Sequence, residues 1–409
     1  MKYPKIILLS SLMGIAFYAT AQNQPKKGNW RASIQREDGK SIVFNLEAAE
    51  VKGKNVFYIV NEPEKMLISN ITRKQDSLFL DLPFFESEFR VRLIGTDSLS
   101  GSWVRKGIQK DIVLPFTATA KNPERFKAEH GAANSSVQGK WKVSFIRGGK
   151  ARPAIGQFIQ QGNKVSGSIL TPSGDYRYLA GIVTGNKLKL STFDGVHAMV
   201  LDADLNKDQL SNGHLYSGMA GYEEWTAVKD ENAKLEAAQT SLKDGESGHL
   251  NFSFKDLDGK QVSINDSRFK NKVVIVQLLG SWCPNCMDET AFLSDYYKQN
   301  KNRGIEVIGL AYEYTGDLKR SKASLQKFRD RFDVQYPILI TPTTVTDSLR
   351  TEKTLPQLTG IKVFPTSLIL DKTGKVVEIH TDFYGPGTGE YYTRYKDEFE
   401  HTITRLLKE

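Results

Sequence analysis

The feature that most constrains this chain is a continuous apolar run, KVVIVQLL at 272–279, that leads directly into the stretch GSWCPNCMDE. Such a run is typical of a strand buried on both faces of a sheet. A helical pattern follows it from about Cys286 to Asn300. Strands that alternate with helices form βαβ units, so the sequence predicts an α/β domain whose central sheet is covered on both faces. A hairpin is expected ahead of the run, at 252–264. After the run we expect strands at 305–312, 363–371 and 375–380, and helices at 318–332 and 390–407.

An internal repeat organises the first half of the chain. GNWRASI, from Gly28, recurs as GKWKVSF, from Gly139, 111 residues later. Two further pairs of segments follow in the same order, DSLFLDL with GNKLKLSTF and DSLSGSW with DQLSNGHL. Apolar and polar residues alternate in these segments, as they do in short antiparallel strands. The repeat therefore predicts two β modules, at 28–120 and 136–229, each a barrel or sandwich that closes on its own strands. A single larger sheet built from both copies is the alternative.

The remaining features of the first half complete the predicted organisation. Its tryptophans are expected to be core residues rather than ligand platforms. The segment at 230–248 is charged and Ala-rich, which indicates a short helix or a linker. The predicted fold class is multidomain, with tandem antiparallel β modules followed by an α/β domain at 249–409. The four tryptophans of the modules are Trp30, Trp103, Trp141 and Trp225.

The two cysteines, Cys283 and Cys286, are the only ones in the chain, and three explanations compete for them. Zinc requires four ligands, of which one Cys-x-x-Cys supplies two, and the six histidines form no His-x₃-His pair. A structural disulfide across so small a loop would remove little chain entropy. A redox couple is favoured over both, because the N–H groups at the start of a helix stabilise a thiolate. Cys283 is then the nucleophile and Cys286 the resolving thiol, with no metal or cofactor expected.

The stretch VVIVQLLGSWCPNCMDE resembles the strand, Trp-Cys-x-x-Cys and helix of the thioredoxin superfamily. More narrowly, residues 249–408 resemble the exported TlpA/ResA-like thiol-disulfide reductases, whereas the β modules lie outside the resemblance. It implies a thioredoxin-like domain in which Cys283 and Cys286 form a redox-active disulfide.

The same resemblance implies a set of substrate contacts. They are Trp282 beside the cysteines and a Phe364-Pro365-Thr366 triplet about eighty residues downstream. A cis bond at Pro365 would leave the backbone of Phe364 free to pair with a substrate peptide as an added strand. The alternative is an ordinary trans proline at the start of a strand.

The resemblance also assigns a role to Glu289, three residues after Cys286. It implies that this carboxylate lies beneath the active site and moves protons for Cys286 during resolution. The alternative is an acid on the helix surface, favourable in the first turn. Gln277 stands where thioredoxins keep a buried aspartate, which leaves Glu289 as the only nearby carboxylate that the sequence suggests.

The N-terminal segment predicts export. Lys2 and Lys5 precede an apolar run at 6–18, and ATAQ then places small residues where a signal peptidase reads. We expect a signal peptide at 1–21, a mature chain from Gln22 and a periplasmic location, with an uncleaved membrane anchor as the alternative. No later stretch has the length and apolar character of a transmembrane helix.

Together these features predict an exported thiol-disulfide oxidoreductase that reduces disulfide-bearing client proteins through Cys283 and Cys286. Because the chain holds no further cysteines, the resemblance implies a separate membrane electron donor that re-reduces the pair. The net charge of +9 is scattered rather than clustered, so no nucleic-acid partner is expected. The alternative is a protein whose β modules bind a surface or partner, with the thioredoxin-like domain as a redox-regulated accessory.

Overall fold

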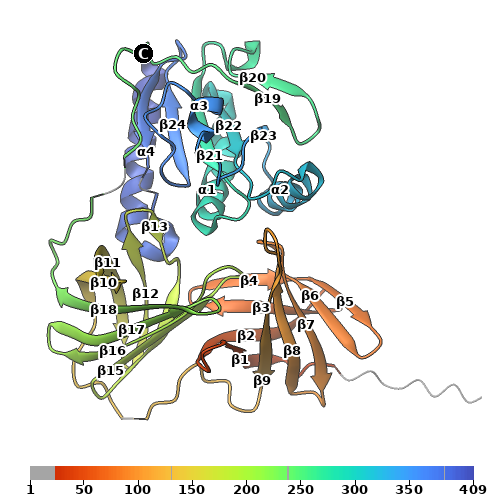
Figure 1. Ribbon diagram of the computed structural model, residues 1–409, viewed down its shortest axis with the longest axis vertical. Helices are drawn as coiled ribbons and strands as arrows, with labels where there is room; N and C mark the ends of the chain where they lie inside the picture. Colours follow the sequence, from red (N-terminus) through yellow and green to blue (C-terminus); the bar gives the residue numbers. More distant parts are fainter. Residues whose placement is uncertain (1–23, 130, 237–238, 382) are drawn as a thin grey trace, which may run out of the picture.

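The computed structural model describes residues 24–129, 131–236, 239–381 and 383–409. The predicted signal peptide at 1–21 therefore lies outside the described residues. Three sheets follow one another along the chain, and Figure 1 shows the two β modules side by side beneath a mixed α/β domain. The predicted fold class is confirmed.

Module 1 is a curved, nine-stranded antiparallel sheet in the order β4-β3-β2-β1-β9-β8-β7-β6-β5. Its first strand shows why these residues form strands, since Trp30, Ala32 and Ile34 are buried while the residues between them are not. A period of two with one buried face is the pattern of a sheet wrapped around a core. The strands are β1 (Gly28–Gln35), β2 (Ser41–Val51), β3 (Lys54–Asn61), β4 (Glu64–Ile68), β5 (Asn70–Lys74), β6 (Ser77–Asp81), β7 (Ser87–Ile94), β8 (Ser98–Arg105) and β9 (Ile112–Thr119).

Module 2 repeats this design in the order β11-β10-β18-β17-β16-β15-β14-β12-β13. An additional ladder between β11 and β12 closes its sheet into a barrel. The strands are β10 (Gly139–Arg147), β11 (Lys150–Gln161), β12 (Lys164–Thr171), β13 (Gly174–Asp175), β14 (Leu179–Thr184), β15 (Lys187–Phe193), β16 (Ala198–Asn206), β17 (Gln209–Ser217) and β18 (Gly221–Lys229).

The sequence repeat corresponds to equivalent strands. The three echoed pairs of segments lie in β1 and β10, β6 and β15, and β8 and β17, which hold the same positions in the two modules. Trp30 and Trp141 each donate an indole hydrogen bond of 2.8 Å to the carbonyl four residues earlier, of Lys26 and Val137. Because each copy forms its own sheet, the alternative of one larger sheet is wrong. All four module tryptophans are buried, as predicted.

The segment between module 2 and the α/β domain forms turns rather than a helix in its described part. Leu242 forms an isolated bridge with Leu358, and the Lys243 N–H donates to the Gln357 carbonyl at 2.8 Å. These contacts attach Leu242 and Lys243 to the α/β domain, and none of the described residues of 230–248 is helical, so the helical alternative is wrong there.

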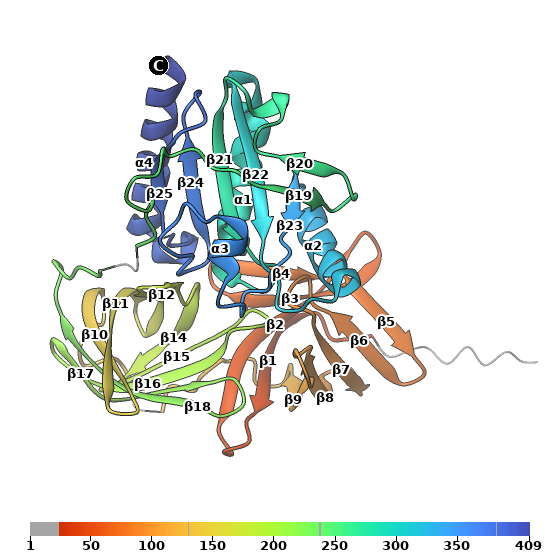
Figure 2. The ribbon, with the colours of Figure 1, turned by 45° about the horizontal axis from the view of Figure 1, so that its top comes forward.

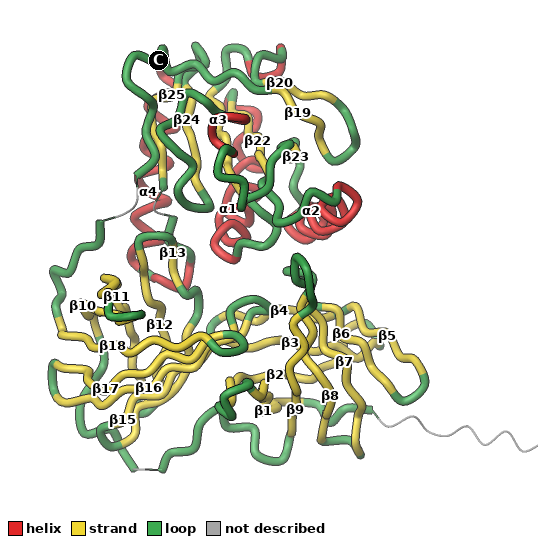
Figure 3. The backbone as a smooth tube through the Cα atoms, in the orientation of Figure 1, coloured by secondary structure: helices red, strands yellow, loops and turns green. Residues whose placement is uncertain are grey.

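The α/β domain is a seven-stranded sheet in the order β20-β19-β23-β22-β21-β24-β25. The central strand β21 is parallel to β22 and antiparallel to β24, and all seven of its residues are buried. Figure 3 shows that the helices of the described chain lie in this domain. The strands are β19 (Ser253–Asp256), β20 (Gln261–Ser263), β21 (Val273–Leu279), β22 (Ile305–Ala311), β23 (Ile338–Ile340), β24 (Thr366–Leu370) and β25 (Val376–His380). The helices are α1 (Pro284–Asn300), α2 (Leu318–Phe332), α3 (Arg350–Thr354) and α4 (Glu390–Lys408), with 3₁₀ turns at Ser267–Phe269, Lys301–Arg303 and Pro386–Thr388.

The expected strands and helices of this domain are present, but β23 and α3 were not predicted. Their three and five residues are too few to display a period of 2 or 3.6. Among the described helices, none is both long and apolar enough to cross a bilayer.

The three parts pack on one another. Phe193 of module 2 stacks on Phe44 of module 1 with ring centroids 4.3 Å apart. Phe84 of module 1 stacks on Phe332 of α2 at 5.3 Å. Figure 2 shows the α/β domain resting on both modules. The modules are therefore packed against this domain and are not joined to it by the connecting segment alone.

Candidate active site

The cysteine pair lies where β21 ends and α1 begins. Cys283 is the N-cap of α1, and its Sγ accepts a hydrogen bond of 3.2 Å from the Cys286 N–H. Pro284 occupies the first turn, where its missing N–H costs no hydrogen bond. Cys283 and Cys286 form a disulfide, and their side chains are buried, with Cys283 4% exposed and Cys286 fully enclosed. The more exposed of the two cysteines is therefore the one at the helix N-terminus.

The predicted substrate contacts divide into two groups. The Phe364–Pro365 peptide bond is cis, and the Phe364 carbonyl oxygen lies 3.5 Å from Cys283 Sγ. The Trp282 ring packs edge-on against Phe364 at 5.6 Å, so these two residues flank the pair. Thr366 is buried, and its hydroxyl donates to the Val363 carbonyl at 2.9 Å, which occupies it within the fold.

Glu289 is fully buried, so the alternative of an acid on the helix surface is wrong. Its carboxylate accepts hydrogen bonds from Gln277 at 2.8 Å, Ser367 at 2.9 Å and Tyr395 at 3.1 Å. Burial raises the pKa of Glu289, and the three donors only partly oppose it. Gln277, in place of the aspartate of thioredoxins, thus serves as a donor to Glu289.

A second carboxylate, Glu313, also adjoins the active-site loop and was missed by the sequence reasoning. It accepts hydrogen bonds from the Ser281 N–H at 2.8 Å and the Ser281 hydroxyl at 2.6 Å. It follows β22 at the edge where the parallel strands β21 and β22 both end, a position that could have drawn attention to it. Glu289 is therefore not the only carboxylate near the cysteines.

Glu313 gives the fold a specific pH dependence. Burial raises its pKa to about 7, above the ~4.3 of an unfolded glutamate. The folded protein therefore holds a proton that the unfolded chain releases, so stability falls as pH rises from 4.5 to 7. Gln at position 313 can still hydrogen-bond to Ser281 but does not titrate. In Glu313→Gln the free energy of unfolding should therefore fall by about 3 kcal/mol less between pH 4.5 and 7 than in wild type. Urea unfolding at the two pH values measures it.

The matched control for this prediction is Glu352→Gln, at an exposed position of α3. It should leave the pH dependence of the wild type in place. An unchanged slope in Glu313→Gln would show that Glu313 does not titrate in this window.

Module 2 reaches directly into the cysteine loop. The Asn285 side chain, between the two cysteines, donates to Asp175 Oδ2 at 3.0 Å, and the Gly385 N–H donates to the same oxygen at 2.7 Å. Burial, and then the charge of Asp288, raise the pKa of Asp175 to about 6. Gly174 has φ +129°, and a Cβ there would lie 2.4 Å from Asn285 Oδ1. Only glycine allows the β13 hairpin this close to the Cys-x-x-Cys loop.

A buried charge cluster joins all three parts of the protein at α1. Arg177, just after β13, forms a bidentate pair with Asp288, two residues after Cys286, with both contacts at 2.8 Å. The same guanidinium contacts Glu64 of β4 at 2.6 Å and Asp194 of module 2 at 3.3 Å. We call these four residues the Arg177 cluster. β4 and β13 are the fourth strands of their modules, so equivalent parts of both copies meet at the active-site helix.

A histidine and a glycine-rich segment also belong to these contacts. His197 lies 3.0 Å from Asp194 and, against the effect of burial, helps to lower the pKa of that carboxyl. The glycine-rich YGPGTGE segment forms a 3₁₀ turn ahead of α4 and supplies the Gly385 N–H that binds Asp175. His214 instead contacts the Tyr222 hydroxyl at 2.9 Å on the outside of module 2.

The C-terminal part of this chain is similar to known proteins. Residues 243–390 match the Redoxin family. The chain is 26% identical over 164 residues to the thiol-disulfide oxidoreductase ResA of Bacillus cereus, covering 40% of this chain and 80% of that protein. It is 29% identical over 128 residues to the ResA protein of Bacillus thuringiensis, covering 31% of this chain and 64%, less than two thirds, of that relative. A solved thiol:disulfide interchange protein from Chlorobium tepidum is 20% identical with a TM-score of 0.30, covering 42% of this chain and 99% of that one.

The α/β domain is thus a thioredoxin-like domain with a Cys-x-x-Cys pair at the start of its first helix. Residues 243–390 are a redoxin domain, with ResA-like thiol-disulfide oxidoreductases as distant homologues of the C-terminal region.

Proposed function

We propose that this protein is an exported, periplasmic oxidoreductase that reduces disulfides in client proteins and is itself re-reduced by a membrane electron donor. The observation that carries the proposal is the position of the pair. Cys283 caps the N-terminus of α1, where the helix favours a thiolate, and Cys286 lies within disulfide distance. The homology to thiol-disulfide oxidoreductases supports the same chemistry.

The reaction requires two exchanges. The Cys283 thiolate attacks one sulfur of the client disulfide, that bond breaks, and the departing client thiolate takes up a proton. Cys286, once deprotonated, attacks Cys283 Sγ, which releases the second client sulfur as a thiolate that is also protonated. Two electrons pass to the client and the enzyme disulfide is left behind. A dithiol donor must then reduce that disulfide before another turnover.

Five buried or half-buried residues serve these steps. Glu289, one helical turn beyond Cys286, takes the proton of the resolving thiol, a role that suits a carboxyl whose pKa burial has raised. The Phe364 backbone, beside Cys283, pairs with an extended client segment, and the Trp282 ring lies against that segment. The contacts from Asp175 and Arg177 hold the first turn of α1 in place while the sulfurs exchange.

The reduction potential of the Cys283–Cys286 couple tests the proposal. The protein from Gln22 onward is equilibrated with dithiothreitol or glutathione and the fraction of disulfide is measured. A value near or below the ~−270 mV of thioredoxin is expected for a reductase. A value near the ~−120 mV of strong oxidants would reverse the direction of the reaction. Failure to form and break the bond reversibly would remove the redox function altogether.

A further inference from the structure

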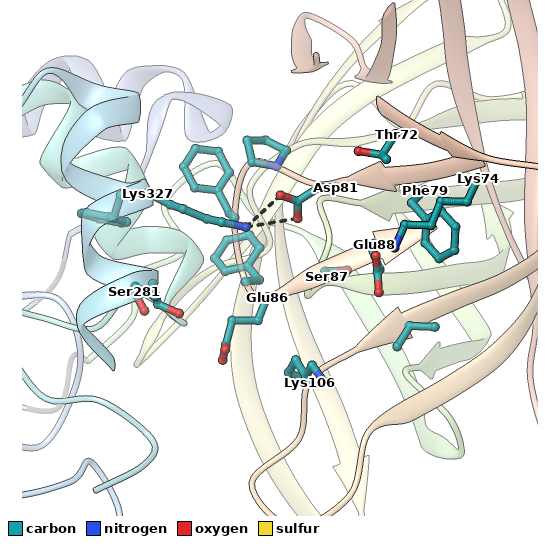
Figure 4. Close-up of a pocket in the computed structure, with 17 residues that line it drawn as sticks. Thr72, Lys74, Phe79, Asp81, Glu86, Ser87, Glu88, Lys106, Ser281 and Lys327 are labelled. Atoms are coloured by element: carbon teal, nitrogen blue, oxygen red, sulfur yellow. Dashed lines mark hydrogen bonds and ion pairs between the residues drawn. The ribbon is translucent and has the colours of Figure 1, made fainter. Parts of the chain in front are cut away.

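Two adjoining cavities lie between module 1 and the α/β domain. The Trp282 cavity, of about 260 Å³, is lined by β8 of module 1 and by the loops after β21 and β22. The Phe84 cavity, of about 470 Å³, lies between β6–β8 and α2. Figure 4 shows Lys327 of α2 reaching across it to Asp81, at 2.9 Å. The cavities share wall residues, among them Phe85 and Ser281, so they form one cleft.

This cleft ends next to the redox centre. Ser281 and Trp282, the two residues immediately before Cys283, line the Trp282 cavity. The first turn of α1, after Cys283, is instead covered by module 2 through the contacts of Asn285 and Asp288. A client segment that approaches Cys283 from the side of module 1 therefore passes through this cleft.

Of the charged residues that line the Trp282 cavity, the two carboxylates are occupied, Glu86 by Arg320 and Glu313 by Ser281, and one cation has no ion-pair partner in the described part of the chain. Lys106 pairs with Asp111 at 3.1 Å, and Arg320 forms a bidentate pair with Glu86. Among the described residues, none forms an ion pair or a hydrogen bond with the guanidinium of Arg105, at the end of β8.

The electrostatic surroundings of Arg105 also distinguish it from the ion-paired Lys106 and Arg320. Burial lowers its pKa, against the attraction of Tyr314 and Asp194. Asp194 is already bonded to Arg177 and His197 within the Arg177 cluster. A partly desolvated guanidinium without a hydrogen-bonded counter-charge gains more from an incoming carboxylate than a solvated one does.

We propose that the Trp282 cavity binds an acidic side chain next to the disulfide of an extended client peptide, with Arg105 as the residue that selects it. This inference rests on the proposed function and names its client class. The cavity has room for a side chain but not for a folded domain. The apolar wall of the adjoining Phe84 cavity, with Phe79, Phe84 and Phe328, accommodates neighbouring residues of the same segment.

The test compares three symmetrical peptide disulfides of the form acetyl-Ala-X-Cys-X-Ala-amide, with Glu, Gln or Lys at X. Pre-reduced protein reacts with each peptide in a single turnover, so no electron donor is needed, and the second-order rate constant is measured. Wild type should reduce the Glu peptide about tenfold or more faster than the Lys peptide, with the Gln peptide between them. In Arg105→Gln the ratio of the Glu-peptide to the Lys-peptide rate constant should fall to about three or less. Arg105→Lys should restore part of this ratio.

The measured quantity is the ratio of the Glu-peptide to the Lys-peptide rate constant within each variant. A general loss of activity lowers both rate constants and leaves this ratio unchanged. Arg92→Gln is the control, because Arg92 is an exposed arginine of module 1 that lines neither cavity, and its ratio should match that of wild type. A preference that persists in Arg105→Gln would come from the overall positive charge and would overturn the proposal. Equal rates on all peptides in wild type would overturn it as well. Failure of wild type to reduce any of them would instead refute the proposed oxidoreductase function.

Discussion

Replacing Cys286 with Ser is expected to stop the reaction after the first exchange and to trap the client on Cys283. Without the resolving thiol, the mixed disulfide has no intramolecular route to release, so steady-state turnover should fall on the order of a thousandfold. The assignment follows from access, because Cys283 is the more exposed cysteine and lies at the helix N-terminus. Non-reducing electrophoresis and mass spectrometry of the adduct measure the effect.

Cys283→Ser is the matched variant for this experiment. It should be equally inactive but should form no adduct, since Cys286 is fully enclosed beneath it. An adduct on Cys286 in Cys283→Ser would reverse the roles of the two sulfurs.

Replacing Arg177 with Met is expected to destabilise the whole fold severely. The variant leaves Glu64, Asp194 and Asp288 near one another without their shared cation. Removing one partner of a buried ion pair typically costs about 3–5 kcal/mol, because the remaining charge stays buried. Urea unfolding at pH 8 measures the loss.

Arg152→Met is the matched control within the same module. Arg152 also makes two contacts to one carboxylate, that of Glu223, but its side chain is 47% exposed, against 2% for Arg177. Its loss should therefore cost about 1 kcal/mol or less.

The pH dependence of Arg177→Met identifies the cause of the loss. Carboxylates that lose their cation have a pKa raised above the unfolded value, so they destabilise the fold progressively as pH rises. The deficit should shrink when pH falls from 8 to 5. Replacing Asp288 with Asn in addition should recover part of the stability. Unfolding at wild-type urea concentrations would show that the Arg177 cluster contributes nothing to the fold.

The fold could be predicted largely because its elements are long enough to show their periods. The unbroken apolar run before Cys283 became the central strand β21, and the helical stretch at 318–332 became α2 with the expected ends. The segment at 230–248 is the instructive exception. Its composition suits a helix, but its described residues form turns and irregular backbone, and Leu242 pairs with Leu358 of the α/β domain. Tertiary contacts of this kind override local propensity and are not visible in a local pattern.

The candidate site could be predicted only in the part that local sequence encodes. The cysteines and their flanking Trp282 form one short motif, and Glu289 is one helical turn away. Arg177 and Asp175 lie 111 and 110 residues before the partners they contact, Asp288 and Asn285, and no pattern in either segment signals the pairing. Such contacts depend on how separately folded modules dock, which a single sequence does not specify.

The two copies of the repeated module contact the cysteine loop and its surroundings in different ways. The second copy supports the cysteine loop, where even the Cβ of Gly174 would have no room. The first copy borders the cleft, so β8 can accumulate substitutions without disturbing that support. We therefore expect substitutions along the cleft wall of module 1 to change which peptides react, while the contacts of module 2 to the cysteine loop remain in place.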